Sequence, residues 1–206
     1  MEISKLIKEK PEGTKSFPIY HLDKLEQGKV FAEASMGFQG KVDYGVNGRK
    51  LTVKTSSTRP VLATLGCQLA GWTMGDAMIS GPVRMKAKKP GFIFEKVDFS
   101  YVPELPNFAC IEGDITDTRL INEMTSNGID SADVLCTTED SQTQFINIPA
   151  RAIEIVLFRL SFLTDINKFK ISKAISNVET SLDKEDLNCE LNDSIRFNGQ
   201  VTLMGD

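Results

Sequence analysis

The sequence predicts an α/β protein, in which strands and helices alternate along the chain. Short apolar runs bounded by turn residues recur through its middle, an amphipathic helical pattern lies between two of them, and Asn47-Gly48 separates two strand-like segments. With 206 residues the chain is long enough for one substantial core. We expect a single compact unit over residues 1–206, with two small α/β subdomains meeting near residues 90–105 as the alternative.

Composition and charge are those of an ordinary globular protein. Hydrophobic residues make up 41% and charged residues 25% of the chain. The net charge is −4 and the pI is near 5.2, whereas binding to nucleic acid or to an anionic membrane needs a concentrated basic surface. The sequence has neither the apolar core of a signal peptide nor the roughly 20 apolar residues of a membrane span. We therefore expect a soluble, cytoplasmic protein with no nucleic-acid or membrane partner.

Alternating apolar residues and the positions of glycines predict the first strands of the chain. Residues 29–36 mix alternating apolar positions with small residues, and Gly37 follows them, which favours a strand that ends in a turn. Two further strands are expected at 41–46 and 50–55, because the Asn-Gly pair between them is the strongest two-residue hairpin signal. From Arg59 to Trp72 the chain is apolar and rich in small residues, which predicts a buried helix.

The middle of the chain alternates between the two kinds of element. Apolar runs predict strands at 92–99, 108–112 and 132–136. An amphipathic helix is expected over 117–127, and Gly128 directly after it is suited to the left-handed conformation that ends many helices.

The clearest helix is predicted to begin near Asn147, with this residue as its N-cap and with Pro149 in the first turn, where a missing N–H costs nothing. Apolar residues recur at helical spacing as far as Leu160 and form a stripe that faces the core. Arg151 and Glu154 lie beside this stripe, three positions apart, so their side chains are neighbours on one face.

The last third of the chain has weaker signals. We expect a short strand over 168–171, a polar stretch over 179–193 and a final strand over 194–204.

The cysteines are widely spaced and lie in or beside apolar runs. No Cys-x-x-Cys motif occurs among the four, which are Cys67, Cys110, Cys136 and Cys189. We therefore expect reduced thiols in the core of a cytoplasmic protein, with a disulfide framework as the alternative. Because the only histidine is His21, a metal site built on soft ligands is not expected.

Two uncommon strings follow each other in the first half of the chain. Residues 65–72 read Leu-Gly-Cys-Gln-Leu-Ala-Gly-Trp, and residues 80–84 read Ser-Gly-Pro-Val-Arg. They resemble the Leu-Gly-small-Gln-x-Ala-Gly-Trp and Ser-Gly-Pro-x-Arg strings of methenyltetrahydromethanopterin cyclohydrolases. Residues 148–154 are similar to that family's Gly-Arg-x-x-Glu helix start, Met36-Gly37 to its Met-Gly-Gly, and residues 197–201 to its Tyr-Gly-Ser-Val strand.

The resemblance touches most of the chain between residues 29 and 203. It implies a fold of mixed sheets with packed helices. The chain is shorter than the family at both ends, has Pro149-Ala150 where the family has Ser-Gly, and lacks the family's Gly-Ala-Gly-Arg-Cys-Pro stretch after the catalytic helix. We therefore expect a divergent, truncated member.

The resemblance also implies an activity, the hydrolysis of a methenyl-tetrahydropterin to its formyl form in one-carbon metabolism such as that of methanogenesis. A tetrahydropterin would be the substrate, with no metal or redox cofactor. The family's catalytic pair matches Arg151 and Glu154. Glu154 would act as the base for water from a solvent-reachable helix face, while Arg151 would orient it and keep it ionised. The alternative is an ordinary surface ion pair.

Substrate-binding residues are expected in the matched strings and at nearby basic and loop positions. These residues are Lys54, Arg59, Gly66, Gln68, Ser80, Gly81, Arg84 and Ser141. The cations would meet the phosphate and carboxylates of a long pterin tail, or would form a solvated basic face. For the glycines the alternative is close packing or a turn, and for Gln68 and Ser80 it is a hydrogen bond within the core or a turn.

A second hypothesis is a related protein with changed chemistry. Such a protein would bind a pterin or a related ligand, serve as an assembly subunit, or act in a neighbouring biosynthetic step. In both cases we expect a homodimer or homotrimer, because the apolar tracts 61–72 and 153–163 hold more hydrophobic length than one small sheet covers.

Overall fold

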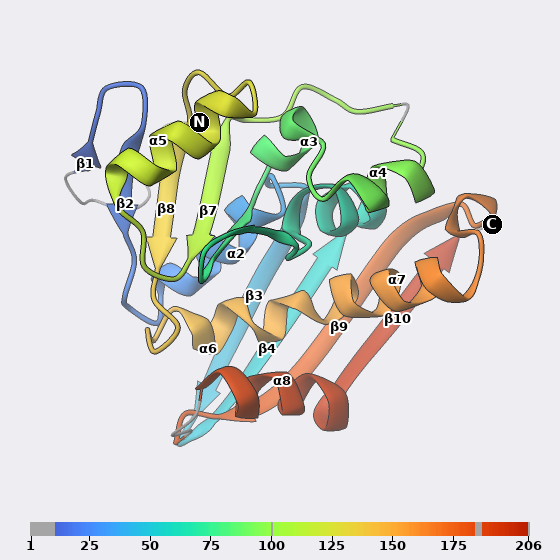
Figure 1. Cartoon of the computed structure of the whole chain (residues 1–206). Helices are drawn as coiled ribbons and strands as arrows, with labels where there is room; N and C mark the ends of the chain where they lie inside the picture. The colour runs from blue at the N-terminus through green and yellow to red at the C-terminus, as the bar shows by residue number, and fades with distance from the viewer. Residues whose placement is uncertain (1–10, 100, 184–186, 206) are drawn as a thin grey trace.

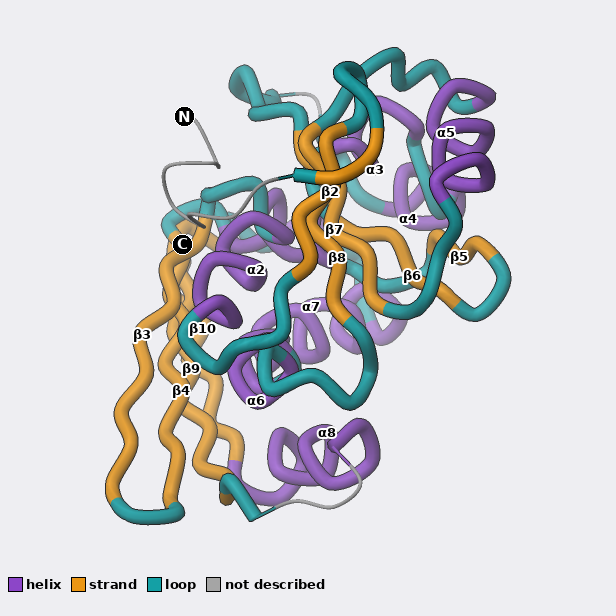
Figure 2. The backbone as a smooth tube through the Cα atoms, turned by 90° about the vertical axis from the view of Figure 1, so that its left-hand side faces the viewer, coloured by secondary structure: helices purple, strands orange, loops and turns teal. Residues whose placement is uncertain are grey.

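Two β-sheets with helices between them form the protein. The structure is a computed structural model that describes residues 11–99, 101–183 and 187–205, without the side chains of 187 and 188. The two sheets lie on opposite sides of a helical layer, which is seen edge-on in Figure 2. The predicted α/β class of mixed sheets and packed helices is confirmed.

The larger sheet has six strands and a mixed pattern. Its order is β1 (Glu12–Gly13), β2 (Pro18–His21), β8 (Asp133–Thr137), β7 (Phe108–Glu112), β6 (Ala77–Ser80) and β5 (Trp72–Met74). The central strands β2, β8 and β7 are parallel, and the other pairings are antiparallel. The carboxyl ends of three strands therefore meet at one edge, the position where α/β sheets commonly bind ligands.

The smaller sheet is antiparallel throughout. Its order is β10 (Gly199–Gly205), β9 (Ile171–Ser181), β4 (Lys50–Ser57) and β3 (Gly40–Asn47). The predicted β3–β4 hairpin is confirmed, with Asn47 paired to Lys50. Gly48 has φ +60° in the two-residue connection, a conformation that glycine adopts at little cost.

Helices cover both faces of the larger sheet and one face of the smaller sheet (Figure 1). They are α2 (Gln27–Ser35), the π-helix η1 (Leu62–Gln68), α3 (Val83–Ala87), α4 (Gly91–Lys96), α5 (Asp117–Ser126), α6 (Gln144–Asn147), the 3₁₀ turn η2 (Pro149–Arg151), α7 (Ala152–Leu163), the 3₁₀ turn η3 (Ile166–Lys168) and α8 (Leu187–Asn198). Helix α5 matches its prediction, and Gly128 after it has φ +76°. Within the described part of the chain, no helix combines the length and apolarity needed to cross a bilayer.

The strand predicted at 29–36 is wrong, because this segment forms most of α2. Phe31 and Ala34 pack against the six-stranded sheet, while Ala32 and Met36 pack against the four-stranded sheet. Burial on two opposite sides removes the single apolar stripe by which a helix is normally detected. Gly37, with φ +62°, ends the helix rather than a strand.

Two other predictions in the first half need correction. The buried helix expected over 59–72 is shorter, because η1 ends at Gln68 and Trp72 begins β5. The strand expected at 92–99 is instead α4, which follows Pro90 and buries Ile93. Its short apolar run of residues 92–94 cannot be told from a strand by hydrophobic period alone.

The C-terminal elements were misplaced by several residues. Residues 166–168 form η3, and β9 begins only at Ile171. Strand β9 extends to Ser181 because Ser176 and Thr180, although polar, are buried at alternate positions with Ala174 and Val178. Helix α8 begins in the stretch predicted to be polar and continues to Asn198, so the final strand begins at Gly199 rather than at 194.

Asn147 is not the N-cap of a long helix. It is the last residue of α6, and η2 connects α6 to α7 so that the three segments run almost continuously across the four-stranded sheet. Pro149 is the first residue of η2, where its missing N–H is tolerated as predicted.

The prediction of core thiols is confirmed for Cys67, Cys110 and Cys136, which are buried and form no disulfide, and it is wrong for Cys189, which is exposed. Burial raises the pKa of Cys67 and of Cys136 to about 12 and that of Cys110 well above its usual value.

The thiols are therefore expected to differ in reactivity, because only the thiolate is alkylated. With iodoacetamide at pH 8, Cys189 should react rapidly in the folded protein and the other three should react only after unfolding in urea. Peptide mass spectrometry after a timed quench measures this. Rapid labelling of Cys67 or Cys110 in the native protein would show that the helical layer is not packed as described.

Candidate active site

The two residues singled out from the sequence form an ion pair at the start of α7. Arg151 is the last residue of η2, and its Nε donates to Glu154 Oε2 at 3.0 Å. Glu154 lies in the first turn of α7, where the helix dipole favours a carboxylate. The predicted contact is confirmed.

The pair is not on a solvated surface. The side chains of Arg151 and Glu154 are only 11% and 6% exposed. The alternative of an ordinary surface ion pair is therefore wrong, and solvent reaches the predicted base only through the small part of its side chain that is exposed. Because η1 and the four-stranded sheet pack against α7, these charges lie where ion pairing is much less screened than at a surface.

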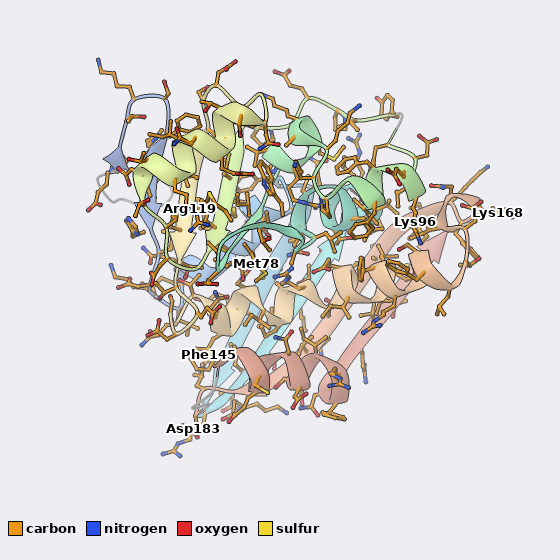
Figure 3. The ribbon with its side chains drawn as sticks, viewed as in Figure 1. Met78, Lys96, Arg119, Phe145, Lys168 and Asp183 are labelled. Atoms are coloured by element: carbon orange, nitrogen blue, oxygen red, sulfur yellow. The ribbon has the colours of Figure 1, made fainter. Side chains whose placement is uncertain are left out.

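A second carboxylate, which the sequence analysis did not identify, completes the site. Glu112 is the last residue of β7, and its Oε1 accepts from Arg151 Nη1 at 3.3 Å. Ile111 faces the core under α5 and Cys110 faces α2, so alternation along the strand directs Glu112 toward the helical layer. Met78 is its cross-strand neighbour in β6 and marks this edge of the sheet in Figure 3.

Amide side chains from α6 hold the second carboxylate. Asn147 Nδ2 donates to Glu112 Oε2 at 2.9 Å and to Gln144 Oε1 at 2.8 Å. Gln144 Nε2 in turn donates to the backbone oxygen of Thr138, just beyond β8. A continuous series of hydrogen bonds therefore runs from the carboxyl edge of the six-stranded sheet to Glu154.

The carboxylates keep the central guanidinium charged. Burial acts to lower the pKa of Arg151, but the charges of Glu154 and Glu112 and the hydrogen bond that Arg151 donates to Glu154 outweigh it, so the pKa is raised. Among the described residues no group donates to Glu154 Oε1. The site thus contains a carboxylate with one oxygen fixed by Arg151 and the other available to accept a proton.

Arg84 is fully buried beside this site, which excludes the solvated basic face that was its alternative. Its Nη1 donates to the backbone oxygens of Leu65 at 3.1 Å and Gly66 at 2.9 Å. Burial lowers the pKa of Arg84 to about 10, and the opposing effects of Cys67 and Glu154 are smaller.

The two matched strings are thus brought into direct contact. Besides the bonds from Arg84, the backbone N–H of Gly81 donates to Cys67 O at 2.8 Å. Gly81 has φ +98°, and a Cβ there would lie 2.8 Å from Phe108 O. The string over 80–84 therefore holds the π-helical string against the six-stranded sheet.

The remaining residues of these strings are also enclosed. Gln68 Nε2 donates to Ser35 Oγ at 3.3 Å, and Ser80 Oγ donates to Cys110 O at 3.4 Å. A Cβ on Gly66 would lie 2.9 Å from Met85 Sδ. These contacts are the core packing and hydrogen bonding given as alternatives to ligand binding.

The other predicted binding residues lie elsewhere. Lys54 on β4 and Arg59 just after it are exposed. Ser141 is buried in the loop before α6, where its hydroxyl donates to Leu22 O and accepts from the backbone N–H of Thr143. The structure therefore does not gather all eight residues around Glu154.

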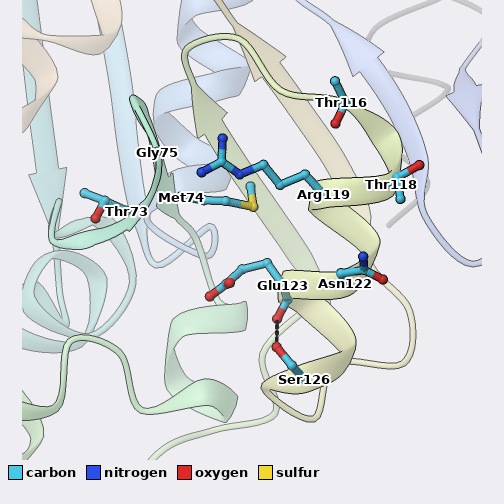
Figure 4. Close-up of a pocket in the computed structure, with 9 residues that line it drawn as sticks. All are labelled: Thr73, Met74, Gly75, Thr116, Thr118, Arg119, Asn122, Glu123 and Ser126. Atoms are coloured by element: carbon cyan, nitrogen blue, oxygen red, sulfur yellow. Dashed lines mark hydrogen bonds between the residues drawn. The ribbon is translucent and has the colours of Figure 1, made fainter.

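Cavities open on the six-stranded sheet. One of about 380 Å³ lies at the carboxyl edge of β2, β7 and β8 and includes Gly113, the residue after Glu112. Another, of about 690 Å³, lies between Gly75 and α5 and is shown in Figure 4 with Arg119 reaching across it. In the described residues, no group of three or more His, Cys, Asp or Glu side chains is placed to hold a metal ion.

One sequence signal would have identified Glu112. Glu112 directly follows the apolar run Phe-Ala-Cys-Ile, in a segment that was correctly predicted as a strand. Polar residues at the carboxyl ends of parallel strands frequently contact ligands, so this position marks Glu112 as a candidate. Asn147 and Gln144 carry no comparable signal, since their role depends on how α6 meets β7.

Comparison with known families tests the resemblance on which the matched strings were interpreted. The family described as Cyclohydrolase (MCH) matches residues 21–206. The chain belongs to this family. The chain is similar to methenyltetrahydromethanopterin cyclohydrolases from Methanococcus aeolicus, 28% identical over 170 residues, and Methanocella arvoryzae, 26% identical over 198 residues.

The family match extends over most of the chain but over less of its relatives. The first alignment covers 75% of this chain and 52% of the Methanococcus enzyme, and the second covers 88% and 61%. The chain thus spans about half the length of the curated relatives it matches. The resemblance found in the strings over 65–72, 80–84 and 148–154 is confirmed at the level of the family.

The buried position of Arg151 leads to a prediction about stability. Arg151→Ala removes the cation bonded to both carboxylates, and breaking a buried pair in this way typically costs about 3–5 kcal/mol of unfolding free energy. Urea unfolding of both proteins at pH 7 measures the difference. Arg49→Ala, which removes an exposed ion pair with Asp183, is the matched control and should cost less than about 1 kcal/mol. Equal effects of the two substitutions would contradict the buried network.

Proposed function

We propose that this chain hydrolyses a methenyl-tetrahydropterin to its formyl form, with Glu154 as the acid–base group and Arg151 as its partner. The observation that carries the proposal is the asymmetric environment of Glu154, in which Oε2 is fixed by Arg151 and Oε1 has no protein donor among the described residues. The relatives, which are methenyltetrahydromethanopterin cyclohydrolases, suggest the substrate class.

The reaction adds water to one carbon and requires proton transfers at the attacking oxygen and at the nitrogen that leaves. The methenyl carbon lies between two nitrogens of a cationic amidinium. Glu154 Oε1 accepts a proton from water as the water oxygen bonds to this carbon, and the carboxylic acid then returns the proton to one nitrogen as its C–N bond breaks. The remaining hydroxyl proton passes to Glu154 and then to solvent, which leaves a formyl group on the other nitrogen. No atom is oxidised or reduced, and we propose that no metal or redox cofactor takes part.

The ion pair with Arg151 supports this role. The guanidinium fixes Glu154 Oε2 at 3.0 Å and so holds Oε1 in one direction, ready to accept a proton as water attacks the carbon. Arg151 Nη2 has no acceptor among the described residues, so it is available to bind the oxygen that is added to the carbon.

The other expected binding residues divide by position. Lys54 and Arg59 are exposed and are proposed to meet anionic groups of a pterin tail. For Gly66, Gln68, Ser80, Gly81, Arg84 and Ser141 we propose an indirect part in binding, because their contacts hold η1, β6 and the loop before α6 in place.

We also propose that the chain works in the cytoplasm as a homodimer or homotrimer. The apolar tract 61–72 does not support this, since most of it is buried within the chain. The C-terminal end of α7 does, because Phe162 and Leu163 are 53% and 83% exposed. Light scattering at micromolar concentration distinguishes such an oligomer from a monomer.

Replacing the proposed acid–base group tests the function. Added to methenyl-tetrahydromethanopterin, the wild-type chain should remove the methenyl absorbance catalytically, and Glu154→Gln should slow turnover by roughly 10²- to 10⁴-fold. Because Glu154 is buried in an ion pair, the same substitution should lower the unfolding free energy by about 1–3 kcal/mol, and not less than 1 as a surface position would predict.

The matched control is Glu179→Gln, which removes a carboxylate from the exposed pair with Lys50 and should leave turnover unchanged. Wild-type turnover that survives in Glu154→Gln would refute the assignment of the base. Tight pterin binding by a wild-type chain without any turnover would show instead a relative that kept the scaffold and lost the reaction.

A further inference from the structure

Glu112 is the member of the buried network whose role remains to be explained. Its carboxylate is 7% exposed, and both of its oxygens are engaged, Oε1 by Arg151 and Oε2 by Asn147. It therefore has less freedom than Glu154 to accept a proton from a bound substrate. Its contacts connect it to the reaction through Arg151.

The geometry of the guanidinium shows what Glu112 contributes. The bond from Arg151 Nε to Glu154 fixes one direction only, and a guanidinium held at a single nitrogen can still turn about that bond. The bond from Nη1 to Glu112 is a second anchor at a different nitrogen, so it determines the plane of the group.

The anchor itself is rigid, because it belongs to both the six-stranded sheet and α6. Glu112 is the last residue of β7, where it is paired with Met78 of β6 and Thr137 of β8. Asn147 donates both protons of its amide, one to Glu112 and one to Gln144. A site carried by strands and helices in this way holds its side chains more precisely than one carried by loops.

The other titratable groups around Glu112 are few. On its own strand Cys110 is buried, and burial raises the pKa of that thiol well above its usual value, so the thiol is neutral. From α3, Arg84 interacts electrostatically with Glu154 and Arg151, and Cys67 of η1 lies beside Arg84. Within the described residues, Arg151 is the only charged group that contacts Glu112 directly.

We propose that Glu112 is a positioning residue that orients Arg151, so that Nε fixes Glu154 Oε2 and directs Oε1 at the substrate carbon. The proposal rests on the cyclohydrolase activity proposed above. Glu112 acts only through Arg151 and does not contact the pterin. Its loss therefore lowers the rate of the chemical step and leaves substrate binding nearly intact.

The test is a double-mutant cycle with the absorbance assay. Glu112→Gln keeps the shape of the side chain but removes its charge and places an amide N–H₂ against a donor, so kcat should fall by about 10- to 100-fold while KM changes by less than about threefold. In the Arg151→Lys background, where the planar guanidinium is already lost, Glu112→Gln should lower kcat by less than about threefold. Glu179→Gln, which removes an exposed carboxylate, should leave both constants unchanged.

A second variant keeps the test valid if Glu112→Gln does not fold. Glu112→Asp retains the charge but withdraws it by one methylene, and it should also lower kcat with little change in KM. Wild-type kcat in a folded Glu112 variant, a rise in KM alone, or an equal loss with Lys at 151 would overturn the positioning role while the cyclohydrolase function stands. A wild-type chain without turnover would overturn the function and, with it, the role of Glu112.

Discussion

A buried guanidinium shared by two carboxylates is the interaction on which the rest of the structure depends. Arg151 binds Glu154 within its own helical segment and Glu112 at the end of a strand in the other layer. Removing charges from water costs several kcal/mol per ion, so such a cluster persists only when each member has fixed partners. The partners come from β7, α6, η2 and α7, and the cluster therefore determines how the six-stranded sheet meets the helical layer.

The matched strings have a structural role of the same kind. Arg84 in the second string donates to the backbone of η1 in the first, and η1 packs along α7 behind Glu154. A π-helix leaves backbone oxygens in unusual positions, and these helices are frequent at functional sites. The two matched strings thus pack against α7, the helix that carries Glu154, and place Arg84 near the shared guanidinium.

The sequence predicted those elements whose signals are local. The β3–β4 hairpin depends on a glycine with positive φ, β7 and β8 are short apolar runs, and α5 has one apolar face. The prediction failed at α2, which is buried on two sides, and at β9, where Ser176 and Thr180 occupy inward positions. In such segments tertiary packing, rather than hydrophobic period, determines the structure.

The candidate site divides in the same way. Arg151 and Glu154 are three residues apart on one helical segment, so their contact could be predicted from spacing and from the family resemblance. Glu112 lies 39 residues before Arg151, and its contact exists only after the strand and the helix have packed. The burial of all three side chains likewise could not be predicted, because it results from η1 and both sheets together.

The most direct test of the account is a crystal structure of the chain with the formyl-tetrahydropterin product bound. We predict that the formyl carbon lies about 3–3.5 Å from Glu154 Oε1, with Arg151 still bonded to both Glu154 and Glu112. A pterin bound in the cavity between Gly75 and α5, or an Arg151 released from Glu112 in the complex, would contradict it.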